Sequence, residues 1–447
     1  MIQPGIFKAN DIRGLVGVEW DEAGARRIGA AFVDAFELAG KEFVLGRDMR
    51  LAGRELSHAF AAGAMSRGAS VVDVGLASTD GLWFASGHFG LPGVQFTASH
   101  NPGGYNGIKF CQANAYPISP EQMAAITELS FAELPPLDLP TAIRQVGDLT
   151  EAYAAKLHSL VDLNGLRRLR VVVDAGNGMA GLTTPVVLGS LHVDLIGLYL
   201  DLDGSFPNHP ANPLEPQNLV DAQRAVLDHH ADLGLVFDGD ADRCFIIDEN
   251  GQVVSPSIIT ALIARAELAR EPGATIVINT ITSRLVNEIV AAAGGQVVVS
   301  AVGHTRMKAK MAEHNAIFGG EHSAHYYFRD FWGADTGMLA ALHVLSLLGK
   351  ASSMSALVEE LSGYVASGEI NSTVADAATA MKAVADRLGD HGVVTWTDGL
   401  LITGDDWWVS VRESNTEPLL RLNVEARTAD WMSELRDAAL ELIRKER

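Results

Sequence analysis

The sequence predicts three similar α/β domains with mixed sheets, followed by a smaller α+β domain with an antiparallel sheet. Over most of the 447 residues, short apolar runs alternate with longer amphipathic stretches, which is typical of βα units. Residues 171–174 and 233–238 form apolar runs that end in Asp, a pattern that favours strands buried on both faces of a sheet. After about Gly368 the strands become closely spaced, and residues 397–399 (TDG) carry a hairpin signal.

The first domain is expected over residues 1–148. A helix is predicted after Asp21, a common N-cap residue, because apolar residues then recur at helical spacing. These apolar residues are Ile28, Phe32, Phe36 and Ala39. Strands are predicted at residues 43–45, 70–74 and 94–97. A proline-rich stretch at residues 134–140 indicates a linker at the end of the domain.

Three further domains are expected over residues 149–252, 253–366 and 367–447. The two strands of the second domain end where ligands usually bind in such sheets, at the carboxyl ends. In the third domain, the pattern predicts strands at residues 275–279 and 297–300 and a helix near residues 339–348. In the fourth, it predicts helices at residues 377–388 and from residue 430, and strands at residues 393–396, 400–403, 407–412 and 419–425.

The composition favours a soluble globular protein, with 48% hydrophobic and 20% charged residues. A formal net charge of -21 argues against nucleic acid and anionic membrane surfaces as partners. No apolar run reaches the length of a membrane span, and the N-terminal residues lack the apolar core of a signal peptide. With only two cysteines, the chain is expected to work in the reducing cytoplasm without a disulfide framework.

Ser99 lies in residues 97–102 (TASHNP), directly after a predicted strand. A serine hydroxyl is a weak nucleophile that needs an activating neighbour, and His100 is the titratable residue next to it. Pro102 and the glycines that follow predict an irregular, exposed loop. Taken alone, this run is interpreted more simply as an ordinary turn.

Three carboxylates follow the second predicted strand of the second domain at alternate positions: Asp238, Asp240 and Asp242, with Arg243 next. Carboxylates this close repel one another unless a cation compensates them. Mg²⁺ prefers hard oxygen ligands of this kind. The run therefore favours a metal site over a solvated acidic turn.

Two further polar runs stand out. In residues 320–325 (GEHSAH), Glu321 could accept hydrogen bonds from sugar hydroxyls and His325 could carry a proton near neutral pH. Residues 412–418 (RESNTEP) combine an arginine with hydroxyl and amide groups, as a phosphate clamp does. A polar surface loop explains either run equally well. Several basic residues are expected to be solvated charges when taken alone: Arg13, Arg47, Arg50, Lys109, His304 and Lys308.

The four runs, one in each domain and in this order, resemble the α-D-phosphohexomutase family, in its phosphomannomutase/phosphoglucomutase branch. The resemblance covers essentially the whole chain. It implies that the four domains surround a central cleft. It also implies an isomerase that interconverts the 1-phosphate and 6-phosphate of mannose, and also of glucose, through a phosphoserine and a bound hexose 1,6-bisphosphate. The cofactors implied are Mg²⁺ and, as an activator, glucose 1,6-bisphosphate or mannose 1,6-bisphosphate.

The resemblance assigns roles to individual residues. Ser99 is implied as the phosphoserine and as a metal ligand, beside the metal ligands Asp238, Asp240 and Asp242. The other catalytic residues implied are Arg13, His100, Lys109, Arg243 and His325, with Lys109 and His325 as candidates for proton transfer. The substrate-binding residues implied are His304, Glu321, Ser323, Arg412, Ser414, Asn415 and Thr416. The expected partner is a small sugar phosphate, and the expected assembly is a monomer or a homodimer.

The sequence departs from the family pattern at three positions. Many relatives carry Met or Gln in place of His322, and Gly in place of Ala324 and Ala241. Gln in place of His322 often accompanies glucosamine-phosphate mutases, so His322 argues mildly against that branch and leaves mannose and glucose open. A phosphoglucosamine mutase and a phosphoserine-dependent phosphatase stay as alternatives. A non-catalytic sugar-phosphate-binding protein is disfavoured, because no catalytic position is missing from the four runs.

Overall fold

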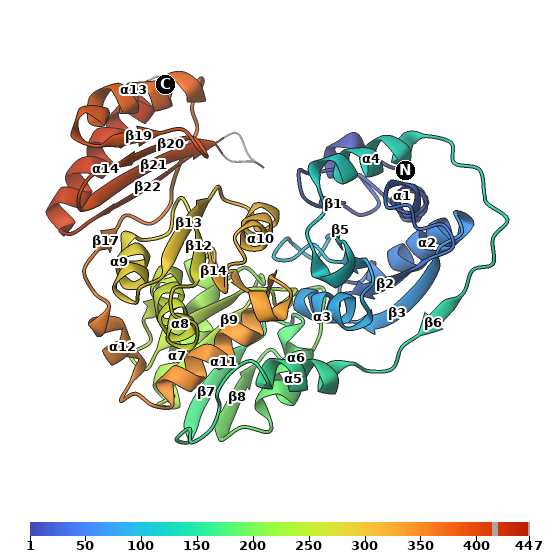
Figure 1. The fold of residues 1–447 in the computed structure, drawn as a ribbon, viewed down its shortest axis with the longest axis horizontal. Helices are drawn as coiled ribbons and strands as arrows, with labels where there is room; N and C mark the ends of the chain where they lie inside the picture. Colours follow the sequence, from blue (N-terminus) through green and yellow to red (C-terminus); the bar gives the residue numbers. More distant parts are fainter. Residues whose placement is uncertain (414–418, 446–447) are drawn as a thin grey trace. The chain divides into compact units, whose positions relative to one another are not determined.

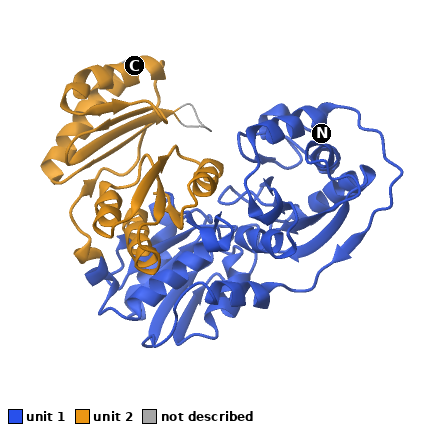
Figure 2. Cartoon of the chain, in the orientation of Figure 1, with its two compact units in different colours: residues 1–254, 323–357 blue, residues 255–322, 358–447 orange. Residues whose placement is uncertain are grey.

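The structure, a computed structural model, describes residues 1–413 and 419–445. The chain divides into two compact units, shown in Figure 2. Unit 1 comprises residues 1–254 and 323–357, and unit 2 comprises residues 255–322 and 358–447. The chain leaves unit 2 and re-enters unit 1 within residues 320–325, one of the four polar runs.

Unit 1 begins with a six-stranded mixed sheet in the order β1-β5-β4-β2-β3-β6 (Figure 1). Its strands are β1 (Ile12–Leu15), β2 (Glu42–Arg47), β3 (Ser70–Leu76), β4 (Gly93–Phe96), β5 (Tyr105–Cys111) and β6 (Ile143–Gln145). β2 pairs parallel with β3 and β4, whereas β5 pairs antiparallel with β1 and β4. Its helices are α1 (Glu22–Ala35), α2 (Gly53–Ser66), α3 (Thr79–Phe89) and α4 (Pro120–Phe131), with 3₁₀ turns at Pro4–Ile6 and Ala113–Ala115.

A second sheet in unit 1 has the order β11-β10-β9-β7-β8. Its strands are β7 (Leu169–Asp174), β8 (Val193–Leu198), β9 (Leu233–Phe237), β10 (Cys244–Asp248) and β11 (Val253–Val254). β7 pairs parallel with β8 and β9, and β10 turns back antiparallel to β9. All residues of β9 are buried, as the continuous apolar run predicts. Its helices are α5 (Thr150–His158), α6 (Ala180–Leu188) and α7 (Val220–Asp228), with a 3₁₀ turn at Pro216–Leu219.

The third set of strands is shared between the units along the sequence. In unit 2, β12 (Thr275–Asn279) pairs parallel with β13 (Gln296–Ser300) and with β14 (Phe318–Gly320). In unit 1, β15 (Tyr326–Phe328) pairs antiparallel with β16 (Ala334–Asp335). The associated helices are α8 (Pro256–Arg270), α9 (Arg284–Ala292), α10 (His304–Glu313), α11 (Gly337–Leu348) and α12 (Met354–Glu360), with a 3₁₀ turn at Arg329–Phe331.

The last part of unit 2 is an antiparallel sheet with two helices. Its strands are β17 (Val365–Ala366), β18 (Ile370–Ser372), β19 (Val393–Thr395), β20 (Leu400–Thr403), β21 (Trp407–Glu413) and β22 (Leu420–Ala426). Its helices are α13 (Ala377–Leu388) and α14 (Ala429–Arg444), with a 3₁₀ turn at Gly389–His391. No helix among residues 1–413 and 419–445 combines the length and apolar character that crossing a membrane requires.

The predicted fold class is confirmed, with mixed sheets in three parts and an antiparallel sheet in the last. Two of the differences from the sequence-based expectation have a clear local cause. The first helix ends at Ala35, before the predicted Ala39, because Glu37 takes a left-handed conformation with a φ of 54°. Strand β5 was not predicted, because the glycines before it resemble a continuing loop.

Candidate active site

Ser99 lies in the turn that follows β4, in unit 1. The sequence predicted an exposed loop here, but Ser99 is buried, with only 3% of its surface exposed. Its φ is 50°, in the left-handed region that few residues other than glycine adopt. The Ser99 N–H donates to the Thr97 hydroxyl oxygen at 2.9 Å, which helps to hold this conformation. The hydroxyl is therefore presented by a tight, buried turn.

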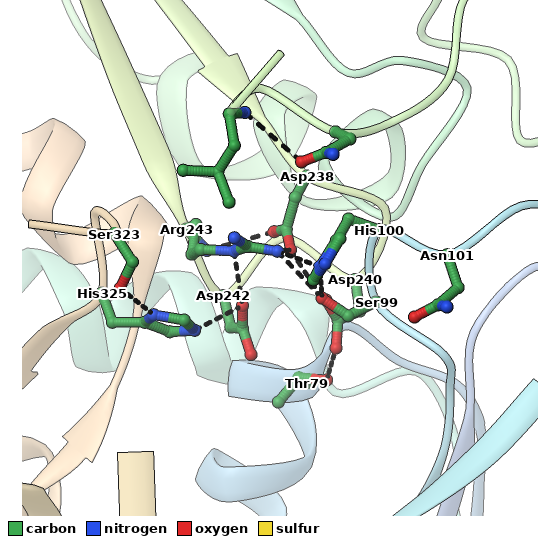
Figure 3. A network of polar contacts seen from close by, with 12 residues as sticks. Thr79, Ser99, His100, Asn101, Asp238, Asp240, Asp242, Arg243, Ser323 and His325 are labelled. Carbon is green, nitrogen blue, oxygen red and sulfur yellow. Dashed lines mark hydrogen bonds and ion pairs between the residues drawn. The ribbon is translucent and has the colours of Figure 1, made fainter. Parts of the chain in front are cut away.

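Three polar groups surround the Ser99 hydroxyl oxygen (Figure 3). The hydroxyl donates to Asp238 Oδ2 at 2.8 Å, and its oxygen lies 3.2 Å from His100 Nδ1. Arg243 Nη2 donates to the same oxygen at 3.3 Å. The nucleophile candidate thus has a carboxylate and an imidazole as proton acceptors and a guanidinium as a partner for negative charge.

His100 is held as a neutral imidazole. Burial, together with the neighbouring cations Arg243 and Arg13, lowers the pKa of His100 well below its usual value. Arg243 donates to His100 Nδ1, and a guanidinium can only donate, so the ring proton belongs on Nε2. His100 therefore faces Ser99 with an acceptor nitrogen.

The three predicted metal-binding carboxylates do lie together. Asp238, Asp240 and Asp242 each offer one oxygen, and these oxygens lie within 4.8 Å of one another. All three side chains are fully buried at the carboxyl end of β9, where Gly239 and Ala241 allow a tight loop. Asp240 Oδ1 makes no hydrogen bond to any described residue, and Asp242 Oδ1 has only long contacts, with His325 Nε2 at 3.5 Å and Arg243 Nε at 3.9 Å, among the described residues. A set of buried carboxylate oxygens with free acceptor capacity fits the ligand preference of Mg²⁺.

Lys109, from β5, is the cation that compensates this loop. Its Nζ lies 2.7 Å from Asp240 Oδ2 and 2.5 Å from Asp242 Oδ2, so Lys109 is not a solvated charge. Burial alone would lower the pKa of Lys109, but the two carboxylates outweigh it and raise the pKa. In this arrangement Lys109 keeps its proton firmly, which suits neutralisation of charge more than exchange of protons.

The carboxylates of the loop differ in their affinity for protons. Burial raises the pKa of Asp238, although Arg243 opposes this effect. Burial acts in the same direction on Asp242, but Lys109 and His325 outweigh it and hold its pKa well below the usual value. Asp238 is also the carboxylate of this loop to which the Ser99 hydroxyl donates, so it lies nearest to the Ser99 proton.

Two more predicted catalytic residues belong to this cluster. Arg13, on β1, donates to Asn101 Oδ1 in the turn after Ser99 at 2.8 Å and forms an ion pair with Asp11. His325 lies with its Nδ1 at 3.1 Å from the Ser323 hydroxyl oxygen and its Nε2 at 3.5 Å from Asp242 Oδ1. Figure 3 shows His325 directed toward residues 238–243, which we call the metal loop. The imidazole is thus placed to relay a proton at the edge of the cluster.

Unit 2 holds other predicted substrate-binding residues. Glu321, at the end of β14, is buried and accepts from the Asn279 side-chain amide at 3.0 Å and from Gly303 N–H at 3.4 Å. Gly303 precedes His304, which begins α10, so the two predicted sugar-binding residues share one neighbourhood. The carboxylate is fixed by donors from the end of β12 and from the residue before α10, as a side chain that binds a sugar should be.

Arg412, at the end of β21, is buried and pairs with Glu369 at 2.7 Å. Glu369 also pairs with Arg421, the residue opposite Arg412 on β22, at 3.2 Å. Two guanidinium groups therefore share one carboxylate. The other predicted phosphate-binding residues, Ser414, Asn415 and Thr416, lie outside the described residues.

The sequence missed Thr79, at the start of α3. Its hydroxyl donates to Asp240 Oδ2 at 2.5 Å, and its N–H donates to the Asp240 carbonyl oxygen at 3.0 Å. Residues 78–80 (STD), after a predicted strand, form a helix-start pattern that could have identified this position. Thr79 thus orients the central carboxylate of the metal loop.

Arg50 and Lys308 were expected to be solvated charges, and both are buried. The guanidinium of Arg50 donates to carbonyl oxygens of the turn that carries Ser99. Backbone carbonyls leave no pattern in a sequence, so only the structure reveals this contact.

Comparisons with known proteins show the family of this chain. Four domain descriptions of phosphoglucomutase/phosphomannomutase match the chain: the α/β/α domains I, II and III at residues 4–135, 151–251 and 255–364, and the C-terminal domain at residues 369–442. The chain belongs to the phosphoglucomutase/phosphomannomutase family. It is therefore an isomerase of the phosphohexomutase type.

Individual relatives are similar over almost their whole length. A phosphomannomutase of Escherichia coli strain K12 is 40% identical over 434 residues, 94% of each chain. Phosphohexose mutases of Xanthomonas campestris are 41% identical over 426 residues, 94% of this chain and 95% of theirs. A crystal structure of a phosphoglucomutase/phosphomannomutase family protein from Burkholderia thailandensis has a TM-score of 0.91 at 32% identity, covering 100% of this chain and 98% of that one.

Two departures from the family pattern gain a physical meaning in the structure. Ala241 and Ala324, where many relatives carry Gly, have φ values of 62° and 65°. A side chain in this left-handed region costs about 1 kcal/mol relative to glycine. In this phosphohexomutase the methyl groups are small enough to be tolerated. The backbone is nevertheless strained at Ala241, within the metal loop, and at Ala324, within residues 320–325.

Replacing either strained alanine by glycine, as A241G or A324G, should raise the free energy of unfolding by up to about 1 kcal/mol. Urea titration measures this change. Ala225→Gly on α7 is the matched control, because replacing an alanine within a helix by glycine should instead lower the free energy of unfolding by about 1 kcal/mol. Equal destabilisation by all three replacements would contradict the account of strain.

A buried network anchors α3, the helix that carries Thr79. Asp80 accepts hydrogen bonds from the hydroxyls of Ser78, Tyr153 and Thr336, the last two at 2.6 Å. Burial raises the pKa of Asp80 to about 6, although the three hydroxyl donors favour its charged form. One carboxylate therefore ties the start of α3 to α5 and to the start of α11.

Asp80 should make stability depend on pH. Because its pKa is raised in the folded state, its contribution is fully present below the pKa of the unfolded chain and is lost as pH rises through about 6. The free energy of unfolding of the wild type should therefore fall by roughly 3 kcal/mol relative to that of D80N between about pH 4 and pH 7. Denaturant titrations of both proteins in EDTA measure the difference, and parallel curves would contradict this assignment.

Proposed function

We propose that this phosphohexomutase interconverts the 1-phosphate and 6-phosphate of mannose, and also of glucose, through phosphorylated Ser99 and a bound hexose 1,6-bisphosphate. The central observation is the Ser99 hydroxyl, buried beside the Asp238 carboxylate and within reach of the Arg243 guanidinium. A phosphoryl-transfer site needs a nucleophile, a proton acceptor and positive charge, and all three are present.

Asp238, Asp240 and Asp242 are the residues that would hold Mg²⁺, together with an oxygen of Ser99. When bound, Mg²⁺ would supply positive charge that stabilises the transferring phosphoryl group. The protein adds two fixed positive charges. Arg243 donates to the Ser99 hydroxyl oxygen, and Arg13 donates to Asn101 in the turn after Ser99.

The proposed reaction has two transfers. In the first, the bond between phosphorus and the Ser99 oxygen breaks, and a bond forms to the free hydroxyl of a hexose 1-phosphate, which loses its proton. The products are a hexose 1,6-bisphosphate and the Ser99 side chain, whose oxygen takes up the proton that the sugar hydroxyl lost. In the second, Ser99 attacks the phosphate at C1, and the bond between phosphorus and the C1 oxygen breaks. The Ser99 proton passes, by way of the Asp238 carboxylate, to the leaving C1 oxygen, and hexose 6-phosphate is released. His325, beside Asp242, is the proposed partner for the sugar proton.

The sugar would be held by Glu321, Ser323 and His304, and its non-reacting phosphate by Arg412 with Ser414, Asn415 and Thr416. The Arg412 pair with Glu369 supports this role, because a guanidinium that already binds a carboxylate is oriented for an oxyanion. Because either end of the bisphosphate must fit the same clamp, the clamp should recognise phosphate strongly and the ring weakly. Glucose 1,6-bisphosphate or mannose 1,6-bisphosphate would act as the activator, because it would phosphorylate Ser99 again in enzyme that has lost its phosphoryl group.

The proposal is tested by following mannose 1-phosphate, glucose 1-phosphate and glucosamine 1-phosphate separately by ³¹P NMR, with Mg²⁺ and a trace of glucose 1,6-bisphosphate. We expect 6-phosphates from the two neutral sugars with little inorganic phosphate. Inorganic phosphate as the main product would show a phosphatase instead. Turnover of the amino sugar alone would show a phosphoglucosamine mutase.

A further inference from the structure

We propose that Arg50 is a positioning residue that fixes the turn carrying Ser99, and that Asp48 and Phe206 hold Arg50 in place. This inference rests on the proposed role of Ser99 as the phosphorylated residue. Arg50 makes no hydrogen bond to Ser99 Oγ; its hydrogen bonds to the turn are all to backbone carbonyl oxygens. It therefore acts on the reaction through the geometry of the turn.

The guanidinium of Arg50 binds four carbonyl oxygens of a single loop. Nη1 donates to the carbonyls of Pro102 and Tyr105, each at 2.9 Å. Nη2 donates to the carbonyls of Ser99 at 2.8 Å and Asn101 at 2.6 Å. Carbonyl groups that would otherwise point apart are thus drawn toward one cation, which fixes the path of the chain from Ser99 to the start of β5.

Two side chains hold the guanidinium itself. Asp48 Oδ2 forms an ion pair with Arg50 Nε at 3.3 Å, and Asp48 Oδ1 accepts from Arg50 N–H at 2.9 Å. The Phe206 ring lies 5.2 Å from the guanidinium carbon, in cation–π contact. Asp48 and Arg50 are both buried. Asp48 and Phe206 therefore orient the guanidinium independently of its hydrogen bonds to the loop.

The Ser99 turn requires such support. A serine with φ at 50° is held in a conformation that costs of order 1 kcal/mol, so the turn would relax if its hydrogen bonds were removed. The metal loop also approaches closely, because a Cβ at Gly239 would come within 2.4 Å of the Ser99 carbonyl oxygen. That carbonyl is one of the four that Arg50 binds, so Arg50 sets the position of Ser99 against Asp238.

Lysine cannot replace this arrangement. A guanidinium offers five N–H donors in a planar fork, whereas an ammonium offers three donors at one point. R50K keeps the charge that balances Asp48 but cannot bridge four carbonyls. A displacement of about 1 Å at a reacting group costs on the order of 100-fold in rate. We therefore expect kcat to fall by about 100-fold in R50K, with KM changed by no more than about twofold.

The experiment measures kcat and KM per active site for wild type, R50K and F206L. Active sites are counted as Ser99 residues that labelled glucose 1,6-bisphosphate phosphorylates, so misfolded protein is not counted. R67K is the matched control, because Arg67 also binds a carboxylate, Asp34, and a carbonyl, but away from the Ser99 turn. We expect R67K to keep the wild-type kcat. In F206L we expect kcat to fall by about 3-fold to 10-fold, which corresponds to the free energy of a cation–π contact.

A kcat per labelled site within about threefold of wild type in R50K would overturn the inference, as would an equal fall in R67K. If R50K yields no folded protein, F206L decides: an unchanged kcat per labelled site overturns the inference. The failure of the proposed function looks different, because wild type itself would then carry no label on Ser99.

Discussion

Ser99→Ala is expected to abolish isomerisation, with kcat lower by about 10⁵-fold, as when a nucleophile is removed from other enzymes. The variant lacks the oxygen that carries the phosphoryl group, and no other described hydroxyl shares the position beside Asp238 and Arg243. The backbone of the turn should survive, because its hydrogen bonds to Thr97 and Arg50 involve only main-chain atoms of residue 99. A coupled assay of glucose 6-phosphate formation measures the loss.

Ser86→Ala is the matched control. Ser86 is fully buried in the same unit, and its hydroxyl donates to the Leu91 carbonyl at 2.6 Å. The Ser86 hydroxyl oxygen also accepts from the Ala115 N–H at 3.0 Å. Removing it should therefore cost about 1 to 3 kcal/mol of stability and leave kcat within about twofold of wild type. If S99A kept more than about 1% of the wild-type kcat while S86A behaved as expected, Ser99 could not be the phosphoryl carrier.

Removal of Mg²⁺ should have the second largest effect. Treatment with EDTA is expected to lower kcat by about 10³-fold or more, because a bound cation contributes several kcal/mol to the stabilisation of a transferring phosphoryl group. The fold should persist without the metal, because Lys109 still pairs with Asp240 and Asp242. Circular dichroism should therefore be unchanged, and added Mg²⁺ should restore activity.

Two variants locate the metal on the predicted loop. Asp240→Asn should raise the Mg²⁺ concentration needed for half-maximal activity by about tenfold or more, because one anionic ligand is lost. Asp248→Asn is the control: Asp248 is also buried and follows on β10, but it accepts from the N–H groups of Asn250 and Gln252 in a turn. Full activity in EDTA, or an equal Mg²⁺ requirement in both variants, would contradict the assignment.

The residues that we propose to carry the chemistry in their own side chains could be selected from the sequence. Ser99, Asp238, Asp240 and Asp242 stand in short runs after apolar strands, where strand ends usually present ligand-binding groups. The hydroxyl and carboxylate groups indicate the chemistry of these residues, and the structure places the four side chains together. What the sequence could not give is their burial, which depends on the packing of both sheets of unit 1.

Residues that act through other residues escaped prediction. Arg50 binds carbonyls, which every residue possesses, so nothing in the sequence distinguishes it from a solvated arginine. The resemblance implied a catalytic role for Lys109, but the glycines before it obscure β5, and only the strand pairing brings Lys109 to Asp240. Asp80 joins α3 to Tyr153 and Thr336, which are distant in sequence.

The central claim is that the phosphoryl group passes through Ser99, and a single-turnover transfer tests it most directly. Enzyme labelled with ³²P on Ser99 is mixed with excess unlabelled mannose 1-phosphate and Mg²⁺, and the reaction is quenched at intervals. The account predicts that the label leaves the protein at least as fast as kcat and appears in mannose 1,6-bisphosphate and then mannose 6-phosphate. Label that stays on Ser99 during many turnovers, or that appears as inorganic phosphate, would contradict it.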